Sequence, residues 1–279
     1  MIRPLCITAA LLLVAGTVLP AQSRNRDRDF GQSDDAWCRD ARDADFCEVR
    51  EETLNNTSTI DVDARGNGGV FVRGWDRNDV HVRARVITYA RNDGDARDIA
   101  REIRLTTQGG VVRADGPSRN RDIFRGWRDR HGWAVSYEVQ VPRNARVTVD
   151  ATNGGIIVEN VRGTIDAETT NGGLMLSDVA GNVRGRATNG GVTIEVAGAR
   201  WQGTGLDVST TNGGVRLFLP RDYSADLEAH ATNGGISVDF PMTVQGLINN
   251  RREIRGTIGS GGPPLRVATT NGGVQIRRR

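Results

Sequence analysis

Short runs of alternating apolar and polar residues fill most of the chain from about Val49 onwards, separated by glycine-rich turns. An alternation with a period of two is typical of β-strands that bury one face. A helical spacing occurs at Ala96–Arg104, where Ile99 and Ile103 lie four residues apart. The pattern therefore predicts an all-β protein with one short helical insert.

The tetrapeptide Thr-Asn-Gly-Gly occurs six times in the second half of the chain. Its asparagines are Asn153, Asn171, Asn189, Asn212, Asn233 and Asn271. The first three are 18 residues apart, and the next two intervals are 23 and 21 residues. Apolar residues recur six and four positions before most of these asparagines, and three and five positions after them. A turn that returns at the length of one structural unit indicates a stacked repeat.

Asn-Gly is also a strong hairpin signal, so a meander of antiparallel hairpins is an alternative arrangement. Two observations favour a parallel β-solenoid with coils of about 18–23 residues. The tetrapeptide returns once per two strands, and the opposite turns, such as "NVRG" and "DVAG", differ from it consistently. Asparagine tolerates the left-handed region and glycine adopts positive φ at little cost, so the turn is expected to reset the facing of the strands.

Stacking the coils in sequence order places charged residues side by side on the outward face. Asp166 and Glu168 are expected beside Arg184 and Arg186 of the next coil, with Asp207 on the far side of Arg184. The same order leaves the last coil at an open end of the solenoid. We expect the arginine run that ends the chain to repel further strands there, and a basic tail for anionic surfaces is the alternative.

The first residues have the pattern of an export signal. Arg3 gives a short positive region, Leu5–Val18 is apolar, and Pro20 with Ala21 supplies a break and a small residue for cleavage. Residues 1–21 are therefore expected to be a signal peptide, and no other segment is apolar enough to span a membrane. We expect an exported protein of the periplasm, the cell surface or the extracellular space.

The rest of the chain is expected to divide into two parts. Residues 22–48 alternate arginine and aspartate, as in "RNRDRD", and predict a flexible mixed-charge leader. Cys38 and Cys47 are expected to pair in an oxidising compartment and to close a loop at its end, with free thiols or metal ligands as alternatives. Residues 49–279 are the repeat domain, irregular over 49–145 and regular over 146–279.

Composition narrows the function. All 37 basic residues are arginine, which excludes any chemistry that needs a lysine, such as a Schiff base or a Walker motif. The net charge is only +3, and the 34 acidic residues are interleaved with the basic ones. A nucleic-acid partner is therefore not expected.

A family resemblance is carried by "VPRNARVTVDATNGGIIVENVRGTIDAETTNGG" from Val141, by the repeats that follow, and by the ending "GTIGSGGPPLRVATTNGGVQI". These segments resemble the bacterial adhesin-labelled family of β-strand repeats, a domain of unknown function related to the toastrack domains of Lia-type envelope-stress proteins. The resemblance covers roughly Val49 to Ile276. It implies an elongated β-solenoid displayed in the cell envelope, in a family without established catalytic residues.

The most distinctive segment outside the repeats is Ser118–Trp133, "SRNRDIFRGWRDRHGW". It interleaves arginines with aromatic residues, a composition suited to stacking and to bidentate contacts with anions. The candidate partner-binding residues are Arg119, Arg121, Phe124, Arg125, Trp127, Arg128 and Trp133. An envelope glycan or a surface protein is the expected partner, and the alternative is a hairpin insertion that covers the end of the solenoid.

The turn residues themselves have two interpretations. Their threonines and asparagines could form a polar ladder that matches a periodic glycan, or the asparagines could bond to each other and cap the turns. We favour capping. Calcium is not expected, because the residue after each Gly-Gly pair is apolar where the calcium-binding nonapeptide needs aspartate.

Catalysis finds little support in the sequence. The histidines (His81, His131 and His230) share no spacing with a nucleophile or a metal ligand. Asp150 and Glu168 stand in one column on adjacent coils and could act as paired carboxylates. We expect a non-enzymatic protein without cofactor or metal, and the alternative is a polysaccharide lyase or hydrolase on a β-helix scaffold.

Overall fold

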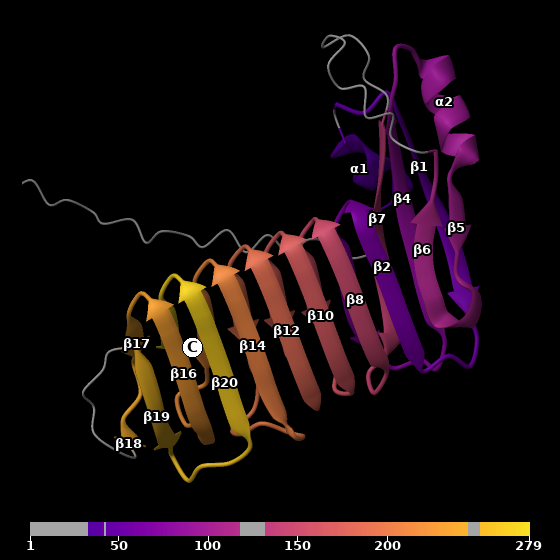
Figure 1. The fold of residues 1–279 in the computed structure, drawn as a ribbon. Helices are drawn as coiled ribbons and strands as arrows, with labels where there is room; N and C mark the ends of the chain where they lie inside the picture. The colour runs from indigo at the N-terminus through magenta and orange to yellow at the C-terminus, as the bar shows by residue number, and fades with distance from the viewer. Residues whose placement is uncertain (1–32, 42, 118–131, 245–251) are drawn as a thin grey trace, which may run out of the picture. The chain divides into compact units, whose positions relative to one another are not determined.

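The computed structural model describes residues 33–41, 43–117, 132–244 and 252–279 (Figure 1). These residues form an all-β structure with two large mixed sheets, neither of which closes on itself. Side chains from both sheets belong to one buried hydrophobic cluster, so the core lies between the sheets. The predicted all-β class is confirmed.

The ten-stranded sheet has the spatial order β1 (Phe46–Leu54), β4 (Val80–Tyr89), β7 (Gly132–Pro142), β3 (Val70–Trp75), β9 (Ile156–Glu159), β11 (Leu174–Ser177), β13 (Val192–Glu195), β15 (Val215–Leu219), β21 (Val274–Arg278) and β17 (Ile236–Val238). The eleven-stranded sheet has the order β18 (Met242–Val244), β19 (Glu253–Ile258), β16 (Ala225–Asn233), β20 (Pro264–Asn271), β14 (Gly205–Asn212), β12 (Asn182–Asn189), β10 (Thr164–Asn171), β8 (Arg146–Asn153), β2 (Thr59–Asn67), β6 (Val111–Asp115) and β5 (Arg104–Thr106). The helices are α1 (Asp34–Arg39), α2 (Asp93–Glu102) and the 3-10 turn η1 (Gln108–Gly110).

Each Thr-Asn-Gly-Gly turn carries the chain from the eleven-stranded sheet to the ten-stranded sheet. The strands that flank the first turn, β8 and β9, pair with strands of different sheets and not with each other. Like strands of successive repeats pair parallel and in register, so that Asn189 lies between Asn171 and Asn212. The alternative of hairpins closed by these turns is therefore wrong.

The alternating apolar positions of the repeats face the core. In the first repeat these positions hold Val147, Val149, Ile156 and Val158, all 0% exposed. The later repeats bury the same positions, apart from Ile236 and Val238 in the edge strand β17, which are half-buried. Each fully buried aliphatic side chain contributes about 1.5–3 kcal/mol, so the stability of the structure accumulates repeat by repeat.

The last repeat does not lie at the end of the stack. β20 lies between β14 and β16 (Figure 1), and β21 lies between β15 and β17. The sixth repeat is thus inserted between the fourth and the fifth, and our prediction of stacking in sequence order is wrong at this point. The first four repeats do follow in order, with Asp166 beside Arg184 and Glu168 beside Arg186 as predicted.

Charge on the outward face favours the insertion. Arg266 of β20 has Asp207 of β14 on one side and Glu228 of β16 on the other. Its guanidinium forms an ion pair with Glu228 at 3.0 Å. In sequence order Asp207 would face Glu228 directly, and like charges at facing positions destabilise a sheet. With Arg184 on the far side of Asp207, the column alternates in sign.

Our prediction that the final arginines repel further strands at an open edge is wrong, because β21 is an interior strand. Arg277 instead pairs with Asp239 at 3.0 Å, and Arg279 lies 3.8 Å from Asp178. The parallel stack of the eleven-stranded sheet ends at β16, where β19 pairs antiparallel with it and β18 with β19. These two strands cover the edge that a further repeat would otherwise join.

The glycines of the turns are required by close packing more than by positive φ. Counting the related turn at Asn67, the first turn glycine has positive φ only at Gly68 (140°) and Gly272 (155°), and none of the turn asparagines does. A Cβ on Gly190 would overlap the carbonyl oxygen of Gly172 in the neighbouring repeat, and the other first glycines meet their neighbours in the same way. Our left-handed explanation of the turn is therefore wrong.

The chain before the repeats adds antiparallel strands and two helices. β1, β4 and β7 pair antiparallel. The expected helical insert is confirmed as α2. Arg50 donates hydrogen bonds to the carbonyl of Ala100 in α2 at 2.7 Å and to that of Ile103, just after the helix, at 2.5 Å. Residues 22–48, expected to be a flexible leader, contain α1 and the start of β1. α2 is the longest helix among the described residues, and none of these helices is long and apolar enough to cross a membrane.

The turn packing predicts a contrast between adjacent glycines. We expect Gly190→Ala to lower the free energy of unfolding by about 1–3 kcal/mol, because the added methyl group must displace backbone atoms. Gly191→Ala places its Cβ 3.5 Å from the Gly214 carbonyl oxygen, an ordinary contact. It should leave stability unchanged or raise it by about 0.4–1 kcal/mol through the unfolded state. Urea unfolding followed by circular dichroism measures both, and equal effects would contradict the packing explanation.

Candidate binding surfaces

Most of the predicted arginine and aromatic binding residues lie outside the described part of the chain. These are Arg119, Arg121, Phe124, Arg125, Trp127 and Arg128. Trp133 is described: it lies in β7, is half-buried against the core, and donates its indole N–H to the Pro117 carbonyl at 3.0 Å. The ring packs closely against Gly116, since a Cβ added to this glycine would lie only 2.8 Å from the nearest ring atom. Trp133 therefore helps to fix Pro117, the last described residue before the segment.

The turn asparagines form one continuous ladder of side-chain hydrogen bonds. In spatial order its members are Asn67, Asn153, Asn171, Asn189, Asn212, Asn271 and Asn233. Each Nδ2 donates to the Oδ1 of the preceding member, over distances of 2.8–3.0 Å. Six of the members are exposed, and Asn67 at the end is half-buried. The interpretation that the asparagines bond to each other matches this geometry, and the seventh member comes from the irregular region.

Two kinds of threonine adjoin the ladder. The threonine next to each asparagine is exposed in five repeats and half-buried at Thr152, and together these form a polar row along the turns. The residue before it is a buried threonine in three repeats, and its hydroxyl donates to a glycine carbonyl of the adjacent repeat at 2.7–2.8 Å. These buried threonines are Thr169, Thr210 and Thr269. Sequence reasoning missed them, although "TTNGG" against "ATNGG" is a visible signal.

Carboxylates gather on the outward face where the irregular region meets the repeats. Asp63 of β2 and Glu168 of β10 lie on either side of Asp150 in β8, as register partners. Asp61 lies on the same face two residues before Asp63. Arg65 forms an ion pair with Asp63 at 2.8 Å. The predicted neighbourhood of Asp150 and Glu168 is thus formed, within a wider group of acidic residues.

These carboxylates differ in their affinity for protons. Burial raises the pKa of Asp150; Arg65 opposes the shift, and the charges of Asp61, Glu168 and Asp63 add to it. The hydrogen bond from Arg65 lowers the pKa of Asp63 below its ordinary value, against the effect of burial. Asp150 therefore holds a proton more readily than an isolated aspartate does.

The described histidines are separate from these carboxylates. His81 stacks on Trp75 with ring centroids 6.4 Å apart and lies 3.5 Å from Glu51. His230 lies beside Thr232, with its Nε2 3.3 Å from the hydroxyl. Among the residues that the structure describes, no three His, Cys, Asp or Glu side chains are placed to hold a metal ion.

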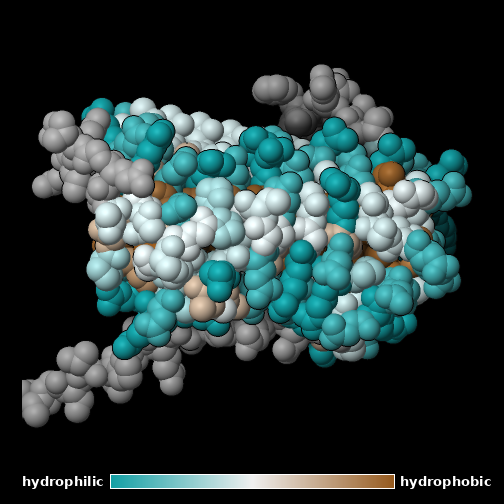
Figure 2. All heavy atoms as spheres, turned by 90° about the horizontal axis from the view of Figure 1, so that it is seen from below, coloured by the Kyte–Doolittle hydropathy of each residue, from teal (hydrophilic) through white to brown (hydrophobic). Residues whose placement is uncertain are grey.

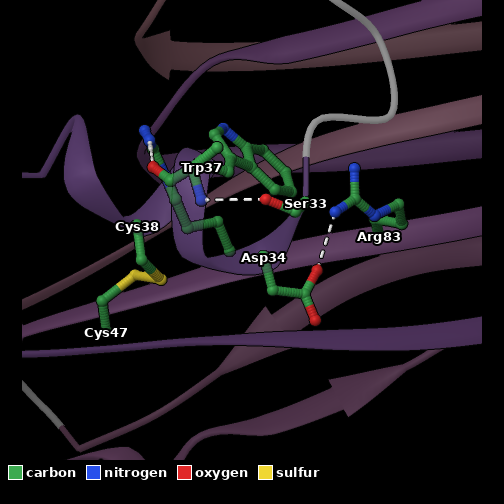
Figure 3. Close-up of a disulfide and its surroundings, with 8 residues drawn as sticks. Ser33, Asp34, Trp37, Cys38, Cys47 and Arg83 are labelled. Carbon is green, nitrogen blue, oxygen red and sulfur yellow. Dashed lines mark hydrogen bonds and ion pairs between the residues drawn. A yellow bond between two sulfur atoms is a disulfide. The ribbon is translucent and has the colours of Figure 1, made fainter.

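An ion network around the buried Arg83 fixes α1 to the ten-stranded sheet, and Figure 3 shows its contact with Asp34. Arg83 of β4, whose side chain is only 6% exposed, contacts Asp34 at 2.8 Å, Glu51 at 2.7 Å and Glu138 at 2.5 Å. Trp37 of α1 lies within 5.1 Å of the same guanidinium. Burial lowers the pKa of Arg83, but its hydrogen bonds to Asp34 and Glu51 and the charge of Glu138 outweigh this and raise it.

The disulfide Cys38–Cys47 joins the end of α1 to β1, which confirms the predicted pairing. Ser33 caps the helix by accepting a hydrogen bond from the Ala36 amide at 3.4 Å (Figure 3). The disulfide, the cap and the Arg83 network together hold a helix of six residues, which has little stability of its own. We interpret this cluster as a structural clamp, because its charged groups satisfy each other.

The face of the molecule drawn in Figure 2 is covered mainly by hydrophilic and intermediate side chains, with hydrophobic residues visible only in small separate spots. A face of this kind suits contacts made by hydrogen bonds and charges.

No family model matches the chain, and no curated protein does. Similar solved structures include a candidate cell adhesion protein from Clostridium sporogenes, a candidate lipid-binding protein from Parabacteroides distasonis and a candidate adhesin from Bacteroides fragilis. They are 10%, 8% and 9% identical to this chain, with TM-scores of 0.44, 0.36 and 0.33. The alignments cover 83%, 83% and 84% of this chain and 100%, 96% and 99% of theirs. Similarity at this level carries no argument about function, and the family relation stays a prediction.

The ladder predicts a measurable loss at its centre. Asn189→Ala removes two amide hydrogen bonds, of 2.9 and 2.8 Å, from the middle of the row. We expect the free energy of unfolding to fall by about 1–2 kcal/mol, at the lower end of two net hydrogen bonds because the site is exposed. Thr188→Ala is the matched control, an exposed neighbour expected to stay within about 0.5 kcal/mol. Urea unfolding compares them, and similar losses in both variants would count against the ladder.

The acidic group predicts a pH-dependent gain in stability. Because the pKa of Asp150 is raised in the folded protein, the folded state binds more protons than the unfolded state. The free energy of unfolding therefore falls as pH rises from below the pKa of Asp150 in the unfolded chain to above its pKa in the folded protein. Asp150→Asn should therefore raise the thermal midpoint at pH 7, with the gain shrinking towards pH 3. Asp166→Asn is the control, expected to give no such gain because Asp166 lies beside Arg184. A lower midpoint for Asp150→Asn at pH 7 would contradict the electrostatic argument.

Proposed function

We propose that this chain is an exported, non-enzymatic parallel β-solenoid that acts as an adhesin-like binding or scaffolding protein of the bacterial cell envelope. The observation that carries the proposal is the ladder of seven asparagines along parallel, in-register strands. Such a ladder offers the same polar groups at every strand spacing, about 4.8 Å. A long, repetitive partner can use this surface, whereas a small molecule can use only one or two of its rows.

Two features support export. Cys38 and Cys47 form a disulfide, and disulfides persist mainly in oxidising compartments outside the cytosol. Residues 1–21 have the sequence pattern of a signal peptide, although they lie outside the described residues.

An envelope glycan or a surface protein is the partner that suits the exposed chemistry. Sugar hydroxyls both donate and accept hydrogen bonds, as do the threonine hydroxyls and asparagine amides of the turns. The segment Ser118–Trp133 adds five arginines and three large aromatic residues, which favour anionic or ring-bearing groups on the partner.

The alternative is a carbohydrate-active enzyme, a polysaccharide lyase or hydrolase, on the same scaffold. One observation favours it: Asp150 and Glu168 are facing residues on adjacent strands, and burial raises the pKa of Asp150. A protonated and an ionised carboxylate close together are what glycosidic bond cleavage needs. The neighbouring acidic residues and Arg65 explain the same arrangement as part of a charged surface.

A retention experiment tests the binding proposal. We expect the purified protein to sediment with at least one of whole envelopes, peptidoglycan and outer-leaflet glycans. Trp127→Ala and Arg128→Ala should each weaken this retention about tenfold, the effect of removing one central contact. Arg216→Ala is the matched control, an exposed arginine on the ten-stranded sheet whose loss should leave retention unchanged.

The same samples discriminate the enzyme. Release of soluble sugar from any fraction, abolished in Asp150→Asn or Glu168→Gln, would favour the lyase or hydrolase. Absence of retention in every fraction would overturn the binding proposal.

A further inference from the structure

The sixth repeat lies between the fourth and the fifth repeats, and we call the space that it occupies the slot. We call residues 264–278, which comprise β20 and β21, the terminal repeat. On one side it pairs with β14 and β15, and on the other with β16 and β17. The four flanking strands all precede it in the chain, so the terminal repeat completes both sheets at once.

The slot matches the terminal repeat in charge. Arg266 lies between Asp207 and Glu228, and Arg277 pairs with Asp239 at 3.0 Å. Of the six repeats, only the third and the sixth carry arginine in the column of Arg266, and Arg184 of the third already lies between Asp166 and Asp207. The carboxylates of the slot thus select the terminal repeat over the four repeats without arginine at this position.

The slot also matches the terminal repeat in its hydrogen bonds. Asn271 donates to Asn212 on one side and accepts from Asn233 on the other, both at 2.8 Å. The buried hydroxyl of Thr269 donates to the Gly213 carbonyl at 2.7 Å. The ladder is therefore interrupted between Asn212 and Asn233 whenever the terminal repeat is absent from the slot.

A glycine-rich hinge connects the terminal repeat to β19. Its glycines Gly259, Gly261 and Gly262 have φ of 57°, 75° and 152°, a backbone that other residues rarely adopt. The hinge crosses the start of β16, where the Ser260 amide donates to Ser224 at 3.2 Å. One short connection, from the end of β19 at Ile258 to the start of β20 at Pro264, therefore joins the terminal repeat to the strands before it.

We propose that copies of this protein exchange their terminal repeats, so that the repeat of one copy fills the slot of another. Every contact of the slot is then reproduced between copies, which is why swapping of a terminal element is a low-cost route to association. The difference between the closed monomer and the exchanged assembly is set by the hinge and by protein concentration. This inference goes beyond the proposed function and does not depend on it.

Crosslinking between differently labelled copies tests the exchange. Ser209 and Ala268 are half-buried facing residues on β14 and β20. Nitrogen-15-labelled protein with Ser209→Cys is mixed with unlabelled protein carrying Ala268→Cys, warmed below the unfolding transition, cooled and treated with a short thiol-specific crosslinker. Each copy holds only one of the two thiols, so a 209–268 linkage must join two copies. We expect mass spectrometry to find this linkage with one labelled and one unlabelled peptide.

Two further variants test whether the linkage depends on the contacts of the slot and whether the two thiols are within reach of each other. Arg266→Glu in the copy with Ala268→Cys should reduce the linkage roughly three- to tenfold, because the new carboxylate faces Asp207 and Glu228. A chain with both Ser209→Cys and Ala268→Cys, crosslinked within itself before mixing, reports that the thiols are within reach and should not exchange.

Thr188→Cys with Ala268→Cys is the collision control, because Thr188 is exposed in the third repeat, which the terminal repeat does not touch. A 209–268 yield no higher than the 188–268 yield would overturn the proposal. A yield that Arg266→Glu leaves unchanged would overturn it as well.

Discussion

The backbone of each Asn-Gly-Gly turn lies so close to the next turn that no side chain fits between them, and this contact fixes the rest of the structure. The first glycines of seven turns meet in one row. A shift of one residue that moved the asparagine into that row would bring a Cβ there, and a shift in either direction would turn every alternating side chain to the opposite face. With the shift excluded, the apolar positions meet in the core, the asparagine amides meet at the edge, and the outward charges meet their neighbours.

The turn fixes how repeats align, but it cannot decide which repeats are neighbours, because all of them carry it. That choice falls to the outward columns, where sign alternates from Asp166 through Arg184, Asp207 and Arg266 to Glu228. Each exposed pair is worth little by itself. Their effect is to penalise wrong orders, since a misplaced repeat sets like charges against each other.

Sequence reasoning succeeded where the information is local and periodic. The strands, the spacing of the turns, the facing of Asp166 and Arg184, and the disulfide all follow from patterns within the repeats or from the cysteine count. It failed where distant residues decide. The place of β20 depends on Asp207 and Glu228, and sequential neighbours usually lie side by side in sheets. α1 depends on Arg83, which lies in β4, and its own segment offers only short local signals, the cap Ser33 and the acidic residues Asp34 and Asp35 of the first turn. The candidate binding residues of Ser118–Trp133 are untested, apart from the packing of Trp133.

The interior position of residues 264–278 has a consequence for truncation. These residues belong inside both sheets, although the strands on both sides of them come earlier in the chain. A chain cut short before Pro264 would lack an internal rung, with two incomplete faces opposite each other, whereas an ordinary repeat protein would merely become shorter. Each sheet is therefore continuous only when residues 264–278 are in place.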